Sequence, residues 1–322
     1  MSEFTILLHN LSNPTLLFFI LGIFAVLVKS DLEIPASSSK FISLYLLFAI
    51  GFKGGQELSH SQMNGEIISS ILFGLALACL IPFYTFFILK RKISISNAAA
   101  IAASYGSVSA VTFVSAISFL EYQNVKSGGH MVAVMALMEA PAIIVGVSLL
   151  NRYHTNSNQK SGIGHVLKHS LTNGSVLLIF GSLLIGYIAD GKQAEGIKPF
   201  TTDIFKGFLS IFLLEMGMVT AKRFSAFKEY GWSMTLFAIL VPLFNGCATA
   251  ILSGLVTDDI GNRFILSILA ASASYIAVPA AMRIAAPEAN PGLYIPMALG
   301  LSFPFNLSVG MPLYYLIIQH FQ

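Results

Sequence analysis

Long stretches without a single Asp, Glu, Lys or Arg run through this 322-residue chain and constrain its fold more than any other feature. A helix needs roughly 20 apolar residues to cross the hydrocarbon core of a bilayer. Only 10% of the residues are charged, against about 25% in an ordinary soluble domain. This excludes a soluble globular domain, a disordered chain and a coiled coil, and predicts a multi-pass membrane protein. The clearest stretches are 4–28, 67–89, 93–120, 169–189, 230–257, 264–282 and 289–322.

Three weaker stretches complete a predicted set of ten spans. Single acids, Glu139 and Glu215, interrupt two of them, and the third, 41–52, is shorter than a span and lies between Lys40 and Lys53. All ten are predicted to be helices, because a membrane barrel would show alternating strands of about ten residues. With both termini outside, 12 of the 18 Lys and Arg residues fall in inside loops and 6 in outside loops. The positive-inside rule therefore predicts a cell-membrane protein with both termini outside.

Four landmarks recur in the same order in the two halves of the chain, at offsets of 160, 166, 168 and 162 residues. Each half would hold five spans, and an odd number inserts the second half upside down, as in the inverted repeats of secondary transporters. The predicted division is a first repeat at 1–150, a linker loop at 151–172 and a second repeat at 173–322. The landmark pairs are SNPTLLFFI (12–20) with TNGSVLLIF (172–180), Gly51 with Gly217, IAAS (101–104) with LAAS (269–272), and MAL (135–137) with MAL (297–299).

Polar residues and helix breakers gather in the middle of the fourth and ninth predicted spans, at matching positions of the two halves. The fourth packs Ser104, Tyr105, Gly106, Ser107 and Ser109 together, and the ninth holds Ser272, Ser274, Tyr275 and Pro279. Breaks free backbone N–H and C=O groups at membrane depth, where they are tolerated only along a cavity or site. Half-helix N-termini suit an anion, while carbonyls and hydroxyls suit Na⁺. The competing interpretation is that small residues only allow close helix packing.

Glu139 is an ionisable residue inside the fifth predicted span, where a charge is costly and usually functional. Its counterpart by position is Ser302, which lies near Asn306. We expect Glu139 to help hold Na⁺ or to pair with a broken helix. The alternative is a structural acid satisfied near a helix end.

Other functions lack the residues that they require. Cys79 and Cys247 have no nearby His, so neither a metal site nor a disulfide framework is expected. The chain has no GxxxxGK[ST] or HExxH motif. The net charge is only +3, so a nucleic-acid partner is not indicated. A membrane enzyme, a sensor and a channel are minor alternatives. An enzyme would need an activated nucleophile and a sensor would need a soluble output domain, and the sequence shows neither.

Four long segments of the chain resemble the SbtA-type sodium-dependent bicarbonate transporters, and weaker similarity extends over nearly the whole chain. The resemblance implies an all-α integral membrane protein with ten transmembrane helices in two inverted five-helix repeats. Helices four and nine would be broken, and the repeats would form core and gate domains with an elevator-like motion. It also implies a homotrimer and no cofactor other than co-transported Na⁺. The segments are AASYGSVSAVTF (102–113), MALMEAPAIIVG (135–146), SASYIAVPAAMRIAAPEANP (272–291) and FPFNLSVGMPLY (303–314).

The resemblance also places the two ions between the broken helices. The anion-binding residues that it implies are Ser104, Tyr105, Gly106, Ser107, Val108, Ser272, Ala273, Ser274, Tyr275 and Ile276. The set expected around Na⁺ is Ser107, Ser109, Glu139, Ser274, Ser302 and Asn306.

The expected function is sodium-coupled symport of bicarbonate into the cell. A sodium symporter for another small anion, such as a carboxylate, is the alternative. Photosynthetic members of the family are regulated by a trimeric PII-like protein at the cytoplasmic face. Here the loop 151–172 is basic and shorter than in those members, which argues against that partner.

Overall fold

The computed structural model describes residues 14–60, 64–153, 174–223 and 227–321, together with the single positions 164, 168 and 172. All regular structure within these residues is helical, as predicted. Six segments have the length and hydropathy of a membrane-crossing helix, so the chain is a multi-pass membrane protein. These segments are Gly65–Leu89, Ile95–Tyr122, His130–Tyr153, Pro199–Lys222, Gly231–Leu255 and Pro291–His320.

Helices of the first half correspond to the first five predicted spans. They are α2 (Pro14–Leu27), α3 (Ala36–Ser59), α4 (Gly65–Leu89), α5 (Ile95–Gly106), α6 (Ala110–Tyr122) and α7 (His130–Tyr153). The short stretch 41–52 is part of α3, which has 24 residues, so the predicted limits at Lys40 and Lys53 were wrong. A lysine near a helix end keeps its ammonium group in the polar zone while its stem lies along apolar surface, so it need not end the helix.

The second half begins after the predicted linker. It contains α9 (Gly174–Ile188), the short α10 (Gly191–Glu195), α11 (Phe205–Arg223), α12 (Phe227–Leu252), α13 (Ile260–Ala271) and α14 (Ala277–Ala285). The last segment runs from α15 (Pro291–Pro296) through α16 (Phe303–Phe305) to α17 (Met311–His320). Two wider π-helical turns, Met297–Ser302 and Asn306–Gly310, flank α16.

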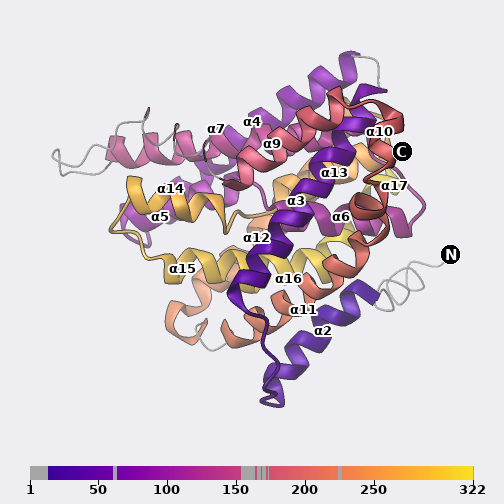
Figure 1. Ribbon diagram of the computed structural model, residues 1–322. Helices are drawn as coiled ribbons and strands as arrows, with labels where there is room; N and C mark the ends of the chain where they lie inside the picture. The colour runs from indigo at the N-terminus through magenta and orange to yellow at the C-terminus, as the bar shows by residue number, and fades with distance from the viewer. Residues whose placement is uncertain are drawn as a thin grey trace.

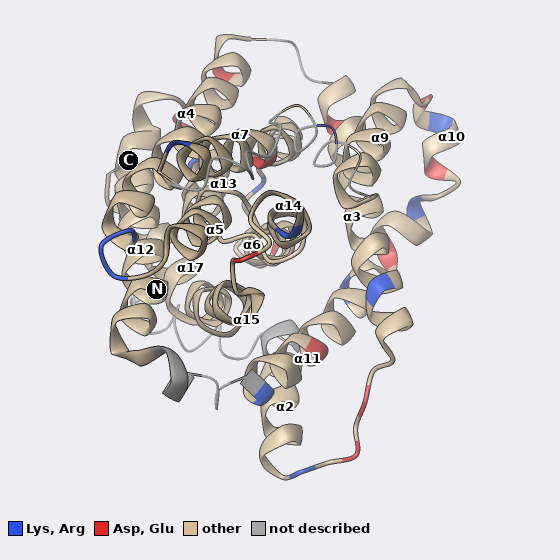
Figure 2. Ribbon diagram, turned by 90° about the vertical axis from the view of Figure 1, so that its left-hand side faces the viewer, with Lys and Arg blue, Asp and Glu red and all other residues tan. Residues whose placement is uncertain are grey.

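Four helices form a group that we call the paired bundle: α2 packs along α11, and α3 packs along α9. Glycine allows both close approaches. A Cβ atom on Gly217 would lie 2.0 Å from the Phe19 carbonyl oxygen, and one on Gly55 would lie 2.1 Å from the Leu183 carbonyl oxygen. Such small-residue contacts are typical of membrane helices. Figure 2 shows the paired bundle on the right of the molecule, with most charged residues at helix ends and in loops.

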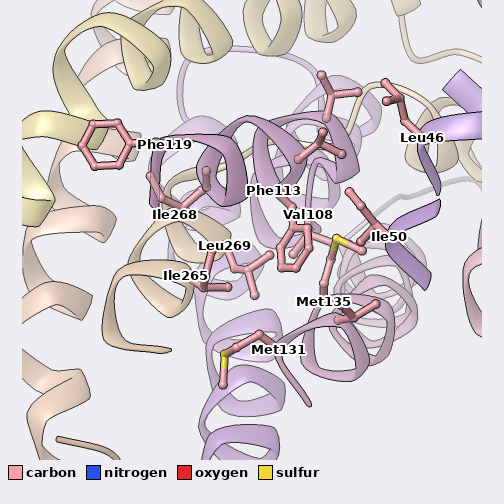
Figure 3. Close-up of a cluster of buried hydrophobic side chains, with 14 of the residues drawn as sticks. Leu46, Ile50, Val108, Phe113, Phe119, Met131, Met135, Ile265, Ile268 and Leu269 are labelled. Carbon is pink, nitrogen blue, oxygen red and sulfur yellow. The ribbon is translucent and has the colours of Figure 1, made fainter. Parts of the chain in front are cut away.

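Helices α4–α7 and α12–α17 form what we call the crossing bundle (Figures 1 and 2). Its apolar core joins α6, α7 and α13 and extends to α3 of the paired bundle. Figure 3 shows this cluster around the segment that links α5 to α6, with the side chains of Leu46, Ile50, Val108, Phe113, Phe119, Met131, Met135, Ile265, Ile268 and Leu269 labelled. The core therefore surrounds the helix interruptions described below.

Most of the predicted linker lies outside the described residues. Of 151–172, the structure describes 151–153, 164, 168 and 172. The expectation about a PII-like partner concerns this loop, most of which lies outside the described residues. Residues 4–13 of the first predicted span also lie outside them.

Candidate functional site

The fourth and ninth predicted spans are each interrupted in the middle, as the sequence predicted. Between α5 and α6 lie Ser107–Ser109, and between α13 and α14 lie Ser272–Ile276. The Ser109 hydroxyl accepts from the Thr112 N–H at 3.2 Å and so caps the start of α6. Pro279, in the first turn of α14, has no N–H to donate to the Tyr275 carbonyl, which favours a break before it. Local chemistry thus favours both breaks.

The two interruptions cross and bond to each other. The Ser274 N–H donates to the Ser104 carbonyl at 2.8 Å, and the Ser104 hydroxyl donates to the Ser274 carbonyl at 2.5 Å. The Ser109 N–H donates to the Ser272 hydroxyl at 3.0 Å. All four serines are buried. Some of the backbone groups that the breaks would leave unpaired at membrane depth are thus satisfied across the two halves.

A small pocket of about 30 Å³ lies beside this crossing. A cavity of roughly 10–15 Å³ already holds one water molecule, so the pocket has room for about two, which is the scale of a small ion without its hydration shell. Its wall brings together residues from both breaks, from α7 and from the paired bundle. They are Leu47, Val108, Ser109, Ala110, Met135, Ala136, Glu139, Ser175, Ile179, Ser274, Tyr275, Ile276 and Ala277.

The pocket combines positive helix ends with one carboxylate. Ala110 and Ala277, the first residues of α6 and α14, both line it, so the N-terminal dipole ends of two helices meet there. Glu139 is half-buried in the same wall. No hydrogen bond or ion pair reaches its carboxylate from the residues that the structure describes. The helix ends can therefore bind an anion, and the carboxylate is available to a cation.

Six of the ten residues expected at the anion do not line the pocket; five are described here, and the sixth, Ser107, is described below. Ser104 and Ser272 make the crossing hydrogen bonds described above, and Ala273, next to Ser272 in the chain, is buried. Gly106 packs on α4, where an added Cβ would lie 2.3 Å from Pro82 Cδ. Tyr105 is also buried, and its hydroxyl lies 2.8 Å from the Ser302 hydroxyl.

Ser302 and Asn306, expected at Na⁺, lie behind the crossing and not in the pocket wall. The Ser302 hydroxyl donates to the Ala238 carbonyl at 2.7 Å. The Asn306 amide donates to the Ala271 carbonyl, the last of α13, at 2.7 Å. Tyr314 in turn donates to the Asn306 side-chain oxygen at 3.3 Å. Both side chains therefore hold the broken helices in position.

Ser107 is the remaining residue predicted for both ions. Its side chain is fully buried, and its hydroxyl has no hydrogen-bond partner within the described parts of the chain. An unsatisfied buried hydroxyl costs about 1–3 kcal/mol. This cost makes Ser107 a candidate ligand for an ion at the crossing.

The far wall of the pocket was not predicted. Leu47 on α3 and Ser175 and Ile179 on α9 close it from the paired bundle. Of these, only Ser175 is polar, and it lies inside the repeat landmark TNGSVLLIF. The landmark could have drawn attention to this residue, but no local signal showed which helix it would face.

An all-helical membrane protein whose two interrupted helices cross beside an ion-sized pocket has the architecture of a secondary transporter. The chain belongs to the Na⁺-dependent bicarbonate transporter superfamily, whose family model matches residues 14–319. This agrees with the resemblance found in the sequence. A comparison with curated proteins gave no match.

Proposed function

We propose that this protein couples the entry of Na⁺ to the uptake of bicarbonate and binds both ions at the crossing of its interrupted helices. The observation that carries the proposal is the pocket in which the N-termini of α6 and α14 meet Glu139. Family membership supplies the identity of the two ions. No Lys or Arg lines this pocket, so the positive helix ends and the co-transported Na⁺ would together offset the anion's charge.

The roles of the residues follow from their positions. The N–H groups at the starts of α6 and α14, with the hydroxyls of Ser109 and Ser274, would bind the anion. Glu139 and the Ser107 hydroxyl would contribute to the Na⁺ site, while Ser302 and Asn306 would position the helices that carry it. Without Na⁺, a bound anion would be repelled by the Glu139 carboxylate, and this repulsion is strong in a medium of low dielectric constant. Each ion should therefore bind weakly unless the other is present.

The order and packing of the helices support two inverted five-helix repeats, 1–150 and 173–322. The first helix of one half packs on the second helix of the other in both directions, α2 on α11 and α9 on α3. We infer that the paired bundle is the gate domain and that the crossing bundle is the core. An elevator-like motion of the core would then carry the pocket past the wall formed by Leu47, Ser175 and Ile179. Both termini would lie outside the cell membrane, and the protein would act as a homotrimer.

A second candidate is a sodium symporter for a small carboxylate, because a carboxylate presents the same charge and oxygen geometry to helix N-termini. Competition separates the two. Proteoliposomes with an inward Na⁺ gradient would take up labelled bicarbonate at low concentration in the presence of excess formate, acetate or unlabelled bicarbonate. Competition by unlabelled bicarbonate alone supports the proposal. Stronger competition by a carboxylate would reassign the substrate and keep the site.

A separate experiment tests the oligomeric state. Chemical cross-linking of the purified protein, with its mass measured in detergent, should give a species of three chains. A monodisperse monomer that transports normally would contradict the trimer and leave the ion site unaffected.

A further inference from the structure

An elongated groove of about 800 Å³ lies outside the ion pocket, at the seam between the paired bundle and the crossing bundle. Its walls come from α3, α9 and α14 and are mainly apolar, with Leu44, Phe48, Leu177, Leu178, Ile185 and Ala280 among them. Leu177 and Ile185 are 63% and 62% exposed. In a multi-pass membrane protein, exposed apolar side chains of this kind suit a surface that faces lipid hydrocarbon, which would open the groove to the bilayer.

The length of the groove matches one leaflet. Along α9 it extends from Gly174 to Ile185, which is roughly 16 Å at 1.5 Å per residue. Half of a hydrocarbon core of about 30 Å is nearly the same length. A groove of this length fits a single acyl chain lying along the membrane normal.

One basic residue marks an end of the groove. Lys40 in the second turn of α3 lines it and is exposed. It makes no ion pair with any residue that the structure describes. The distribution of Lys and Arg residues predicts that this end of α3 lies on the inside of the membrane. Basic residues between membrane helices on that side bind anionic lipid headgroups.

We propose that the groove is a binding site for an anionic phospholipid of the inner leaflet, with one acyl chain along α9 and its phosphate on Lys40. Ile276 and Ser175 line both the groove and the ion pocket. A bound chain would therefore press on the residues that separate the ions from the lipid. The inference rests on a membrane-embedded chain with the orientation proposed above, and it does not depend on which anion is transported.

Gly181 offers a way to fill the groove without disturbing the protein. It lines the groove, and an added Cβ would meet no atom within 4 Å. Gly207 on α11 is equally open but lies outside the groove. Gly181→Phe should therefore exclude the acyl chain, and Gly207→Phe is its matched control.

The test uses the full-length protein in phosphatidylcholine vesicles that carry a trace of phosphatidylglycerol with a photoreactive acyl chain. After illumination, labelled peptides are identified by mass spectrometry. We expect labels concentrated on α9 between Leu177 and Ile185, lost in Gly181→Phe and kept in Gly207→Phe. Lys40→Gln should lower α9 labelling by the phosphatidylglycerol probe about fivefold, the effect of one lysine near an anionic surface, without changing labelling by a matched phosphatidylcholine probe.

Two results would overturn the proposal. Labels spread evenly over the lipid-facing helices, α4 and α12 included, would mean that the groove binds no particular lipid. Equal α9 labelling by the phosphatidylglycerol and phosphatidylcholine probes in the unmodified protein would show that Lys40 selects no anionic headgroup. Neither readout measures transport, so a failure here is distinct from a failure of the proposed function.

Discussion

Ser104 and Ser274 are hydrogen-bonded to each other twice, although 170 positions separate them in the chain. The Ser274 N–H donates to the Ser104 carbonyl at 2.8 Å, and the Ser104 hydroxyl donates to the Ser274 carbonyl at 2.5 Å. These bonds tie the interruption of one half to that of the other. The two broken helices are thereby held as one rigid unit at the wall of the ion pocket.

Removing one of these bonds should damage both the fold and transport. Ser104→Ala leaves the buried Ser274 carbonyl without its side-chain donor, so we expect a loss of about 1–3 kcal/mol in stability. The measurement is thermal unfolding in detergent together with Na⁺-dependent uptake. The control is Ser115→Ala, because the equally buried Ser115 hydroxyl donates at 3.0 Å to Val111 in its own helix. If the two variants behave alike, the crossing bond has no special role.

Glu139→Gln keeps the shape of the side chain and removes its charge. Since Glu139 lines the pocket and receives no partner from the described residues, we expect at least a tenfold higher Na⁺ concentration for half-maximal uptake. Glu195→Gln, on the short exposed helix α10, should leave the Na⁺ curve unchanged. An unchanged Na⁺ curve for Glu139→Gln would remove this carboxylate from the Na⁺ site.

Gly217→Ala should disrupt the paired bundle. The added methyl group would lie 2.0 Å from the Phe19 carbonyl oxygen, and α2 would have to move away from α11. Overpacking of this kind costs about 1–3 kcal/mol. Gly207→Ala, on the same helix but with no atom within 4 Å of the new methyl group, should be as stable as the unmodified protein. Equal melting temperatures for the two variants would contradict the close contact.

Cross-linking can test whether the two bundles move against each other. Glu121 on α6 receives Lys53 of α3 at 3.2 Å and Lys206 of α11 at 3.1 Å, so one carboxylate joins the crossing bundle to the paired bundle. In a protein lacking Cys79 and Cys247, we would pair Glu121→Cys with Lys206→Cys and add a short bifunctional reagent. Uptake should stop and should return when a cleavable linker is reduced.

The matched control for this experiment pairs Lys53→Cys with Lys206→Cys, since both positions belong to the paired bundle. A linker between them should leave uptake intact. Continued transport with Glu121 and Lys206 positions linked would exclude an elevator-like motion between the bundles.

The interruptions could be predicted from sequence because their causes are local. Gly, Pro and a run of Ser residues in mid-span together favour a break in a helix, and Ser107, Ser109, Ser274 and Tyr275 were identified on that basis. The limits of α3 could not be found in this way. Lys40 and Lys53 ended an uncharged run, but both lie inside one continuous helix.

Contacts between helices that lie far apart in the sequence could not be predicted. Gly51 and Gly217 were visible as repeat landmarks, yet only the structure shows that they touch α9 and α2. Ser302 and Asn306 were grouped with Na⁺ by their polarity and position. Their hydrogen bonds to the Ala238 and Ala271 carbonyls depend on how α12 and α13 pack against the last segment, which no local pattern records.

The most direct measurement is the initial rate of labelled bicarbonate uptake into proteoliposomes as a function of external Na⁺, for the unmodified protein and for Ala277→Leu. Ala277 is buried in the pocket wall at the start of α14, so the larger side chain would fill the ion site. We predict uptake that requires Na⁺ in the unmodified protein and is lost in the variant while the protein remains folded. Equal uptake without Na⁺, or unchanged uptake in folded Ala277→Leu, would contradict coupled binding at this crossing.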